Sequence, residues 1–167
     1  MNEDIVNEIS QGFALINYIG HGDQKKLSAE KILSIEDLPS LSTTDKFGLW
    51  VVGTCKFGQY DNDECMAEEL ITSENASIGV ISTVRSISSN YNTSFLTYLF
   101  NEYVSHFNSN NVIRLGDIIS LAKNTSYNDN SFYQGYVFHL FGDPALPIFS
   151  SKKQEGYDFP NTINLIE

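Results

Sequence analysis

The sequence predicts an α/β fold built on a mostly parallel sheet with helices on both faces. Three short apolar runs, at residues 13–19, 47–54 and 76–83, have the length of strands, and each of them is bounded or interrupted by glycine. Continuous apolar character is typical of strands that are buried on both faces of a parallel sheet. Segments with helical spacing lie before, between and after these runs, and this alternation favours parallel strands joined by crossover helices.

The helices follow from apolar residues at three- and four-residue spacing. The longest is expected over 91–107, where Phe95, Leu96 and Leu99 share one face. The aromatic-rich stretch 131–141 fits either a helix or a strand, and we favour a helix. The remaining expected elements are helices at 2–11, after an N-cap at Ser28, at 64–73 and at 115–124, an edge strand containing Pro147 at 145–149, and a tail or linker at 150–167.

The composition is that of a globular chain and limits the classes of partner. The 167 residues are 41% hydrophobic and 13% aromatic, which suits one domain with a sizeable core. The formal net charge of −11 argues against nucleic acid, because nucleic acid is bound through basic patches. No apolar stretch approaches the roughly 18 residues of a membrane span. The acidic start, with Glu3 and Asp4, does not fit a signal peptide.

The two cysteines, Cys55 and Cys65, predict neither a disulfide framework nor a zinc site. Disulfide-stabilised secreted domains of small size carry more cysteines than this. Structural zinc sites use spacings such as C-x₂-C, which the sequence lacks. We therefore expect two free thiols and no bound metal at the cysteines.

A histidine and a cysteine each follow one of the predicted strands. His21 lies in a Gly-His-Gly turn after the strand at 13–19, and Cys55 follows the strand at 47–54. The carboxyl ends of neighbouring parallel strands meet on one edge of a sheet, where open α/β sheets bind their ligands. If these strands are neighbours, a thiol and an imidazole lie within reach, which is the minimal apparatus of a cysteine hydrolase. The N–H groups of Gly22 and Cys55 would then stabilise an oxyanion.

Each of these two residues also suits a structural role. Free cysteines are among the most buried residue types, so Cys55 alone fits a place in the core. A histidine after a strand, such as His21, is often only a loop residue. Their joint placement at the ends of two predicted strands favours the catalytic interpretation more than either residue does alone.

Further residues near the same edge are candidates for substrate binding. They are Tyr60, Thr83 and Arg85, although Arg85 equally fits a solvated loop arginine. Asp61 and Asp63 have the oxygen ligands and the spacing that suit calcium, without the full pattern of an EF-hand loop. We favour the alternative that the acidic residues here precede a helix and stabilise its positive end.

Four segments, taken in order along the chain, resemble the gingipain-like cysteine peptidases of family C25. They are residues 17–22 (NYIGHG), 54–61 (TCKFGQYD), 67–70 (AEEL) and 140–146 (LFGDPAL). A lone Gly-His-Gly is weak, whereas the ordered set is much more specific. The second segment is most similar to the branch that holds the type IX secretion sortase PorU. The resemblance covers about residues 12–149.

This resemblance implies a caspase-like three-layer sandwich with a mostly parallel sheet, in which 1–149 form the C-terminal part of a catalytic domain. It implies that Cys55 is the nucleophile, that His21 is the general base, and that the N–H groups of Gly22 and Cys55 form the oxyanion hole. The third, acidic catalytic residue of the family lies well upstream of the histidine, so we do not expect it in this sequence. Many members carry a tryptophan shortly after Gly-His-Gly, where this sequence has 23–27 (DQKKL).

The predicted function is that of a cysteine endopeptidase that needs no organic cofactor and acts on polypeptides. By resemblance it would process secreted proteins at the bacterial cell surface, with other domains of a longer parent chain and outer-membrane secretion machinery as partners. A broad secreted protease is the competing version. A non-catalytic peptide-binding or scaffold domain of the same fold remains the alternative, and a serine hydrolase is disfavoured because no G-x-S-x-G motif is present.

Overall fold

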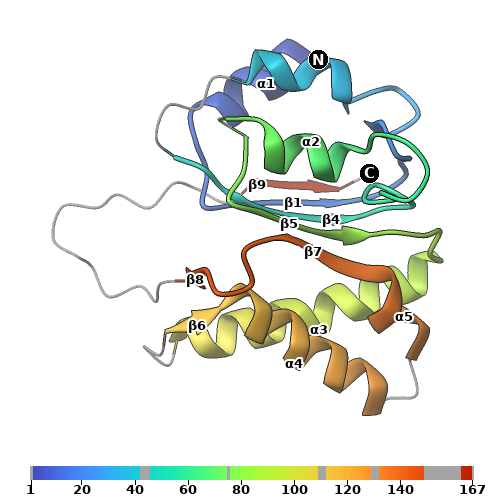
Figure 1. Cartoon of the computed structure of the whole chain (residues 1–167), viewed down its shortest axis with the longest axis vertical. Helices are drawn as coiled ribbons and strands as arrows, with labels where there is room; N and C mark the ends of the chain where they lie inside the picture. The colour runs from blue at the N-terminus through green and yellow to red at the C-terminus, as the bar shows by residue number, and fades with distance from the viewer. Residues whose placement is uncertain are drawn as a thin grey trace, which may run out of the picture.

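A three-layer α/β arrangement forms the protein, as predicted. The structure, a computed structural model, describes residues 2–41, 46–74, 76–108, 112–128, 132–148 and 163–166. A five-stranded sheet of order β7-β5-β4-β1-β9 lies between helices on its two faces (Figure 1). Its strands are β1 (Leu15–Ile19), β4 (Leu49–Gly53), β5 (Gly79–Thr83), β7 (Phe138–Gly142) and β9 (Ile163–Ile166).

The three strands predicted from the apolar runs are the centre of this sheet. β4 pairs in parallel with β1 on one side, from Leu15↔Leu49 to Ile19↔Gly53, and with β5 on the other. The strands that lead to His21 and Cys55 are therefore parallel neighbours, which was the condition for the two residues to lie close together. β9 extends the sheet in parallel beyond β1, within a segment for which no strand was predicted.

Side chains alternate between the two faces of the sheet, as the two-residue period of a strand requires. Trp50 and Val52 of β4 point into the core cluster that holds α1 and α2, whereas Val51 points into the cluster that holds α3, α4 and α5. The indole N–H of Trp50 donates to the Ala76 carbonyl at 3.2 Å. The helices are α1 (Asn2–Ser10), α2 (Met66–Thr72), α3 (Ser89–Asn108), α4 (Leu115–Asn128) and α5 (Phe132–Val137).

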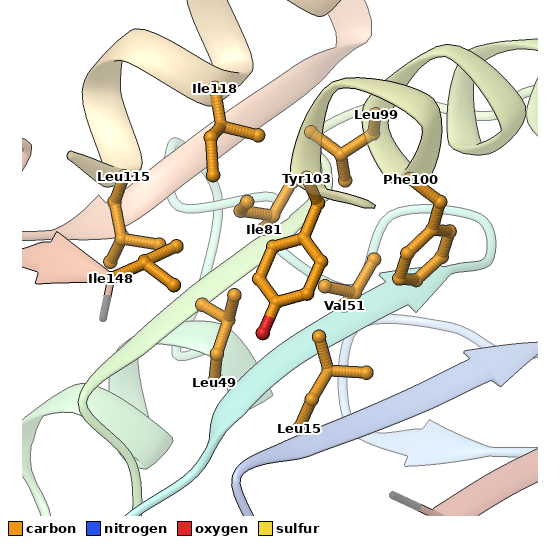
Figure 2. A pocket seen from close by; sticks show the side chains of 10 residues that line it. All are labelled: Leu15, Leu49, Val51, Ile81, Leu99, Phe100, Tyr103, Leu115, Ile118 and Ile148. Carbon is orange, nitrogen blue, oxygen red and sulfur yellow. The ribbon is translucent and has the colours of Figure 1, made fainter. Parts of the chain in front are cut away.

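A small apolar pocket lies on the α3 and α4 side of the sheet. Figure 2 shows Tyr103 of α3 extending its ring toward Leu15 and Leu49. Burial raises the pKa of the Tyr103 hydroxyl. Leu15 and Leu49 are the first residues of β1 and β4. The pocket therefore lies toward the end of the strands opposite to His21 and Cys55, among side chains that form the core.

The prediction of a helix directly after Ser28 is wrong. The short strands β2 (Lys26–Leu27) and β3 (Leu33–Ser34) pair antiparallel there, and a 3-10 helix, η1 (Ile35–Ser40), follows. Ser28 has a φ of 62°, and its hydroxyl donates to the Glu30 carboxylate and accepts the Glu30 N–H. Such local side-chain bonds favour a turn over a helix.

The stretch 131–141 is a helix in its first half alone. α5 ends at Val137, and β7 continues directly from Phe138, antiparallel to β5. β7 is a strand because its backbone groups form hydrogen bonds with β5, and this pairing cannot be inferred from the local sequence. Pro147–Ile148 forms β8, which pairs with β6 (Ile113–Arg114) outside the main sheet. Residues 149–162 lie outside the described residues.

The other predicted helices are present, with ends shifted by a few residues. Within the described part of the chain, no helix has the length and apolar character needed to cross a membrane.

Candidate active site

His21 and Cys55 occupy equivalent positions after two paired strands. The last register pair of β1 and β4 is Ile19↔Gly53, and each candidate residue lies two positions further on. Neighbouring strands are about 4.8 Å apart, so this register places the two residues at the same level of one sheet edge. The His21 side chain is exposed and Cys55 is half-buried.

The hydrogen-bond ladder between β1 and β4 ends just before these two residues. Its last rung runs from the Gly20 N–H to the Gly53 carbonyl at 3.3 Å. In a continued parallel ladder, the next two rungs would use the Cys55 N–H and then the Gly22 N–H. Neither bond is formed, and within the described residues neither N–H has an acceptor. The two groups predicted for an oxyanion hole are thus the two donors that the ladder leaves open.

Gly22 approaches the residue before Cys55 closely. A Cβ atom at Gly22 would lie 2.8 Å from Thr54 Oγ1 and 2.8 Å from the Lys26 carbonyl oxygen. Only a glycine fits between these atoms without a shift of backbone. Gly22 also forms an antiparallel bridge with Leu27, flanked by bonds from Ser28 N to His21 O and from Asp23 N to Lys26 O. In such a pair the Gly22 N–H points away from Leu27.

The backbone of His21 is held in place while its ring remains exposed. The His21 carbonyl accepts the Tyr18 hydroxyl at 2.5 Å and the Ser28 N–H at 2.8 Å. Tyr18 is a buried residue of β1, so the loop is anchored to the core. The imidazole is therefore presented from a fixed turn.

The Cys55 sulfur lies on the β5 side of β4. Sγ is 3.5 Å from both the N and the O of Ile87, in the loop after β5. The thiol donates to the carbonyl, and a thiolate would accept the N–H. Among the described residues, no hydrogen bond joins this sulfur to the His21 ring.

Thr83 lies elsewhere than its predicted role in substrate binding requires. The side chain is fully buried, and its hydroxyl donates to the Thr54 carbonyl. The strand register puts Thr83 beside the end of β4, inside the sheet, and not in the loops that follow the strands. The interpretation of Thr83 as a substrate contact is corrected: it holds the backbone that leads into Cys55.

Arg85 is at the predicted edge but is engaged within the protein. Its guanidinium forms two bonds to the Asp61 carboxylate, at 2.6 and 3.2 Å, and one to the Val84 carbonyl at 2.7 Å. The Lys56 N–H also donates to the Arg85 carbonyl at 3.3 Å. Arg85 therefore ties the loop after β5 to the loop after Cys55. Its role toward substrate stays a prediction.

The calcium interpretation of Asp61 and Asp63 also stays a prediction. Both carboxylates already face cations, since Asp63 pairs with Lys25 at 3.3 Å and Asp61 with Arg85. Within the described residues, no group of three or more His, Cys, Asp or Glu side chains is arranged to hold a metal ion. Both cysteines are free thiols, as predicted.

Tyr60 is exposed and contacts the edge strand β7. Its ring centroid lies 5.9 Å from that of His139 and 6.0 Å from that of Phe141. Burial lowers the pKa of His139, and the charges of Lys123 and Arg85 lower it further, while a bond to the Tyr136 carbonyl acts in the opposite direction. The Tyr60 loop is thus packed against β7 beside the candidate site.

Asn92 is a residue of the site that was not predicted. It lies in the first turn of α3, is buried, and donates from Nδ2 to the Gly53 carbonyl at 2.7 Å. The sequence carries a signal for it. Position 92 precedes Phe95 and Leu96 by three and four residues, so Asn92 is a polar residue on the apolar face of the predicted helix.

The sequence model of peptidase family C25 matches residues 1–149. The chain belongs to peptidase family C25. The predicted resemblance to this family is confirmed, while the assignment to the sortase branch stays a prediction. No curated protein matches the C25 chain at significant similarity.

Solved structures share the fold of this C25 chain. The Arg-specific cysteine proteinase gingipain R matches with a TM-score of 0.75 and 15% identity over 89% of this chain and 36% of that one. The complex of the pro- and mature domains of Porphyromonas gingivalis RgpB matches with a TM-score of 0.74 and 15% identity over 87% and 36%. A further solved structure, described as that of a protease, matches with a TM-score of 0.74 and 17% identity over 92% of this chain and 40% of that one. The C25 chain therefore has the gingipain fold and spans little more than a third of these structures.

Proposed function

We propose that this chain carries the catalytic dyad of a cysteine endopeptidase, with Cys55 as nucleophile and His21 as general base. One observation carries the proposal. In a chain of family C25, a cysteine and a histidine lie two residues beyond an in-register pair of parallel strands. Two N–H groups left open by the same strand pair support it, because acyl transfer needs donors for the oxyanion.

The chemistry follows from these positions. Cys55 turns from Ile87 toward His21, which removes the thiol proton, and Sγ attacks the scissile carbonyl carbon. The N–H groups of Gly22 and Cys55 stabilise the oxyanion. The C–N bond breaks as His21 protonates the leaving amine, which leaves a thioester. Water, deprotonated by His21, then releases the acyl group and restores the thiol.

Labelling of the parent protein by a thiol-reactive peptide electrophile tests this dyad. Mass spectrometry should find the label on Cys55, and Cys55→Ala should abolish both labelling and peptide hydrolysis. His21→Ala should slow hydrolysis by about 10²–10⁴, the usual contribution of a general acid–base group. Cys65→Ala is the matched control and should change neither. Undiminished labelling and turnover in Cys55→Ala would refute the proposal.

The finer proposal is that the enzyme processes secreted proteins at the bacterial surface, as a sortase does. The similarity of residues 54–61 to the sortase branch supports it. Cells carrying Cys55→Ala should accumulate secreted cargo with its C-terminal sorting segment still attached. Normal cargo processing, together with loss of general proteolysis, would favour a broad secreted protease instead.

A non-catalytic peptide-binding domain is the second candidate. The position of the Cys55 sulfur against Ile87, without a bond to His21, favours it. This candidate predicts that peptides bind the unsubstituted parent protein and its Cys55→Ala variant equally well and are cleaved by neither.

A further inference from the structure

Two side chains from different elements hold the peptide bonds that lead into Cys55. The hydroxyl of Thr83, the last residue of β5, donates to the Thr54 carbonyl. The side-chain amide of Asn92, from α3, donates to the Gly53 carbonyl at 2.7 Å. Both side chains are buried, at 0% and 6% exposure, so both bonds are shielded from water.

The Thr83 bond fixes the direction of the Cys55 N–H. The Thr54 carbonyl and the Cys55 N–H belong to one planar trans peptide unit, in which C=O and N–H point in opposite directions. Because Thr83 holds the carbonyl toward β5, the N–H is directed toward β1. Gly22 follows β1 on that side, and its own N–H is also outside the ladder.

The Asn92 bond acts one peptide earlier. The Gly53 carbonyl accepts both the Gly20 N–H at 3.3 Å and Asn92 Nδ2 at 2.7 Å. The amide lies directly over Gly53, since a Cβ there would be 2.5 Å from Asn92 Oδ1. The shorter of the two bonds to the Gly53 carbonyl therefore comes from α3 and not from the last rung of the ladder.

Asn92 is not explained by stability alone. Its Oδ1 is buried and has no hydrogen-bond partner among the described residues, and the same is true of Thr54 Oγ1. A buried polar atom without a partner destabilises a fold, and such atoms in native proteins call for a specific explanation. A leucine has nearly the shape of asparagine and would suit the neighbouring Leu96 better in the apolar face of α3.

We propose that Thr83 and Asn92 are positioning residues, which hold the Gly53–Thr54–Cys55 backbone so that the Cys55 N–H points toward β1 and faces the acyl oxygen of the substrate. The inference rests on the proposed function, because an oxyanion forms only if Cys55 attacks a carbonyl group. Neither side chain touches substrate, since both are buried.

Two reactions of Cys55 in the parent protein separate positioning from a general structural role. Peptide hydrolysis uses the oxyanion donors, whereas alkylation by iodoacetamide uses the sulfur alone. Thr83→Val, which keeps the shape and removes the hydroxyl, should lower kcat on the order of ten- to a hundredfold, approaching the loss of an oxyanion donor. KM and the alkylation rate should stay within about twofold. Thr83→Ser retains a hydroxyl and should restore most of kcat.

Asn92→Leu should lower kcat by a smaller factor, about three- to tenfold, because it acts one peptide further away. Asn101→Leu, at an exposed position of the same helix, is the matched control and should leave kcat unchanged. The inference is overturned if Thr83→Val keeps full kcat. It is also overturned if hydrolysis and alkylation fall by the same factor, or if serine fails to rescue a folded protein.

Amide hydrogen exchange tests the same inference without any activity. By NMR, the Cys55 and Gly22 amides should exchange rapidly, while the amides of β1 and β4 are protected. A protected Cys55 amide in the unsubstituted protein would refute the inference. If the amides behave as expected but no hydrolysis occurs with Cys55 present, the proposed function fails and the backbone arrangement stands.

Discussion

The two cysteines, separated by nine residues, have opposite surroundings. Cys55 follows the central strand β4, at the C-terminal ends of the parallel strands, and its sulfur lies beside the Ile87 backbone. Cys65 directly precedes α2, is fully buried, and donates to the Glu68 carboxylate at 3.2 Å. Burial raises the pKa of the Cys65 thiol to about 11. Position relative to the sheet edge, and not residue type, decides which thiol is open to chemistry.

The largest expected contrast is in alkylation of the native protein. At pH 8, a thiol with a pKa of about 11 is a thiolate in only about one molecule in a thousand, and the Cys65 sulfur is also inaccessible. Iodoacetamide should therefore modify Cys55 at least about 10² times faster than Cys65, as measured by mass spectrometry of the peptides. In strong denaturant the two rates should become similar. Comparable alkylation rates of the two cysteines in the native protein would contradict this prediction.

A cavity beside Cys65 should weaken its protection selectively. Leu70 of α2 is fully buried in the same core cluster as Cys65. Leu70→Ala should lower the free energy of unfolding by about 2–5 kcal/mol. If Cys65 reacts through unfolding, a loss of about 3 kcal/mol should raise its alkylation rate about a hundredfold. Ile78→Ala, at an exposed position, is the control, and an unchanged Cys65 rate in Leu70→Ala would show that local motion exposes the thiol.

The smallest expected effect is on the Cys55 side and depends on pH. The pKa of His139 is lowered from its ordinary value of about 6.5, mainly by burial. At pH values between the pKa of His139 in the folded state and its pKa in the unfolded state, the unfolded chain binds more protons. The free energy of unfolding therefore falls as the pH drops below about 6.5. His139→Gln should make the urea midpoint less sensitive to a change from pH 7 to pH 5, with His106→Gln as control. An equal pH dependence in the His139 variant would exclude this histidine as its source.

The central strands and the pairing of the candidate dyad were predictable because they depend on local patterns. Continuous apolar runs identified β1, β4 and β5, and their parallel order then fixed the edge on which His21 and Cys55 lie. β7 was not predictable, since Phe138–Gly142 is a strand only because β5 offers an unpaired edge. The turn at Ser28 depends on a bond to Glu30 that competes with the helix the sequence also permits.

The roles of the surrounding side chains depend on contacts that the sequence does not encode locally. Thr83 was expected at the open edge, but its register with β4 buries it against the Thr54 carbonyl. Arg85 is at the edge, but Asp61, 24 positions away, binds its guanidinium. Asn92 joins the site through a helix on one face of the sheet. Such long-range pairs follow from topology, so only the strand ends could be inferred beforehand.

Trp50 gives the protein an internal reporter of the strand that carries Cys55. It is the only tryptophan in the chain, it is 1% exposed, and it lies in β4 five residues before the cysteine. Its emission comes from one known place, so a shift to longer wavelength marks the entry of water at β4. The alkylation rate of Cys55 and the tryptophan fluorescence that reports on β4 can therefore be measured on one sample, without an added dye.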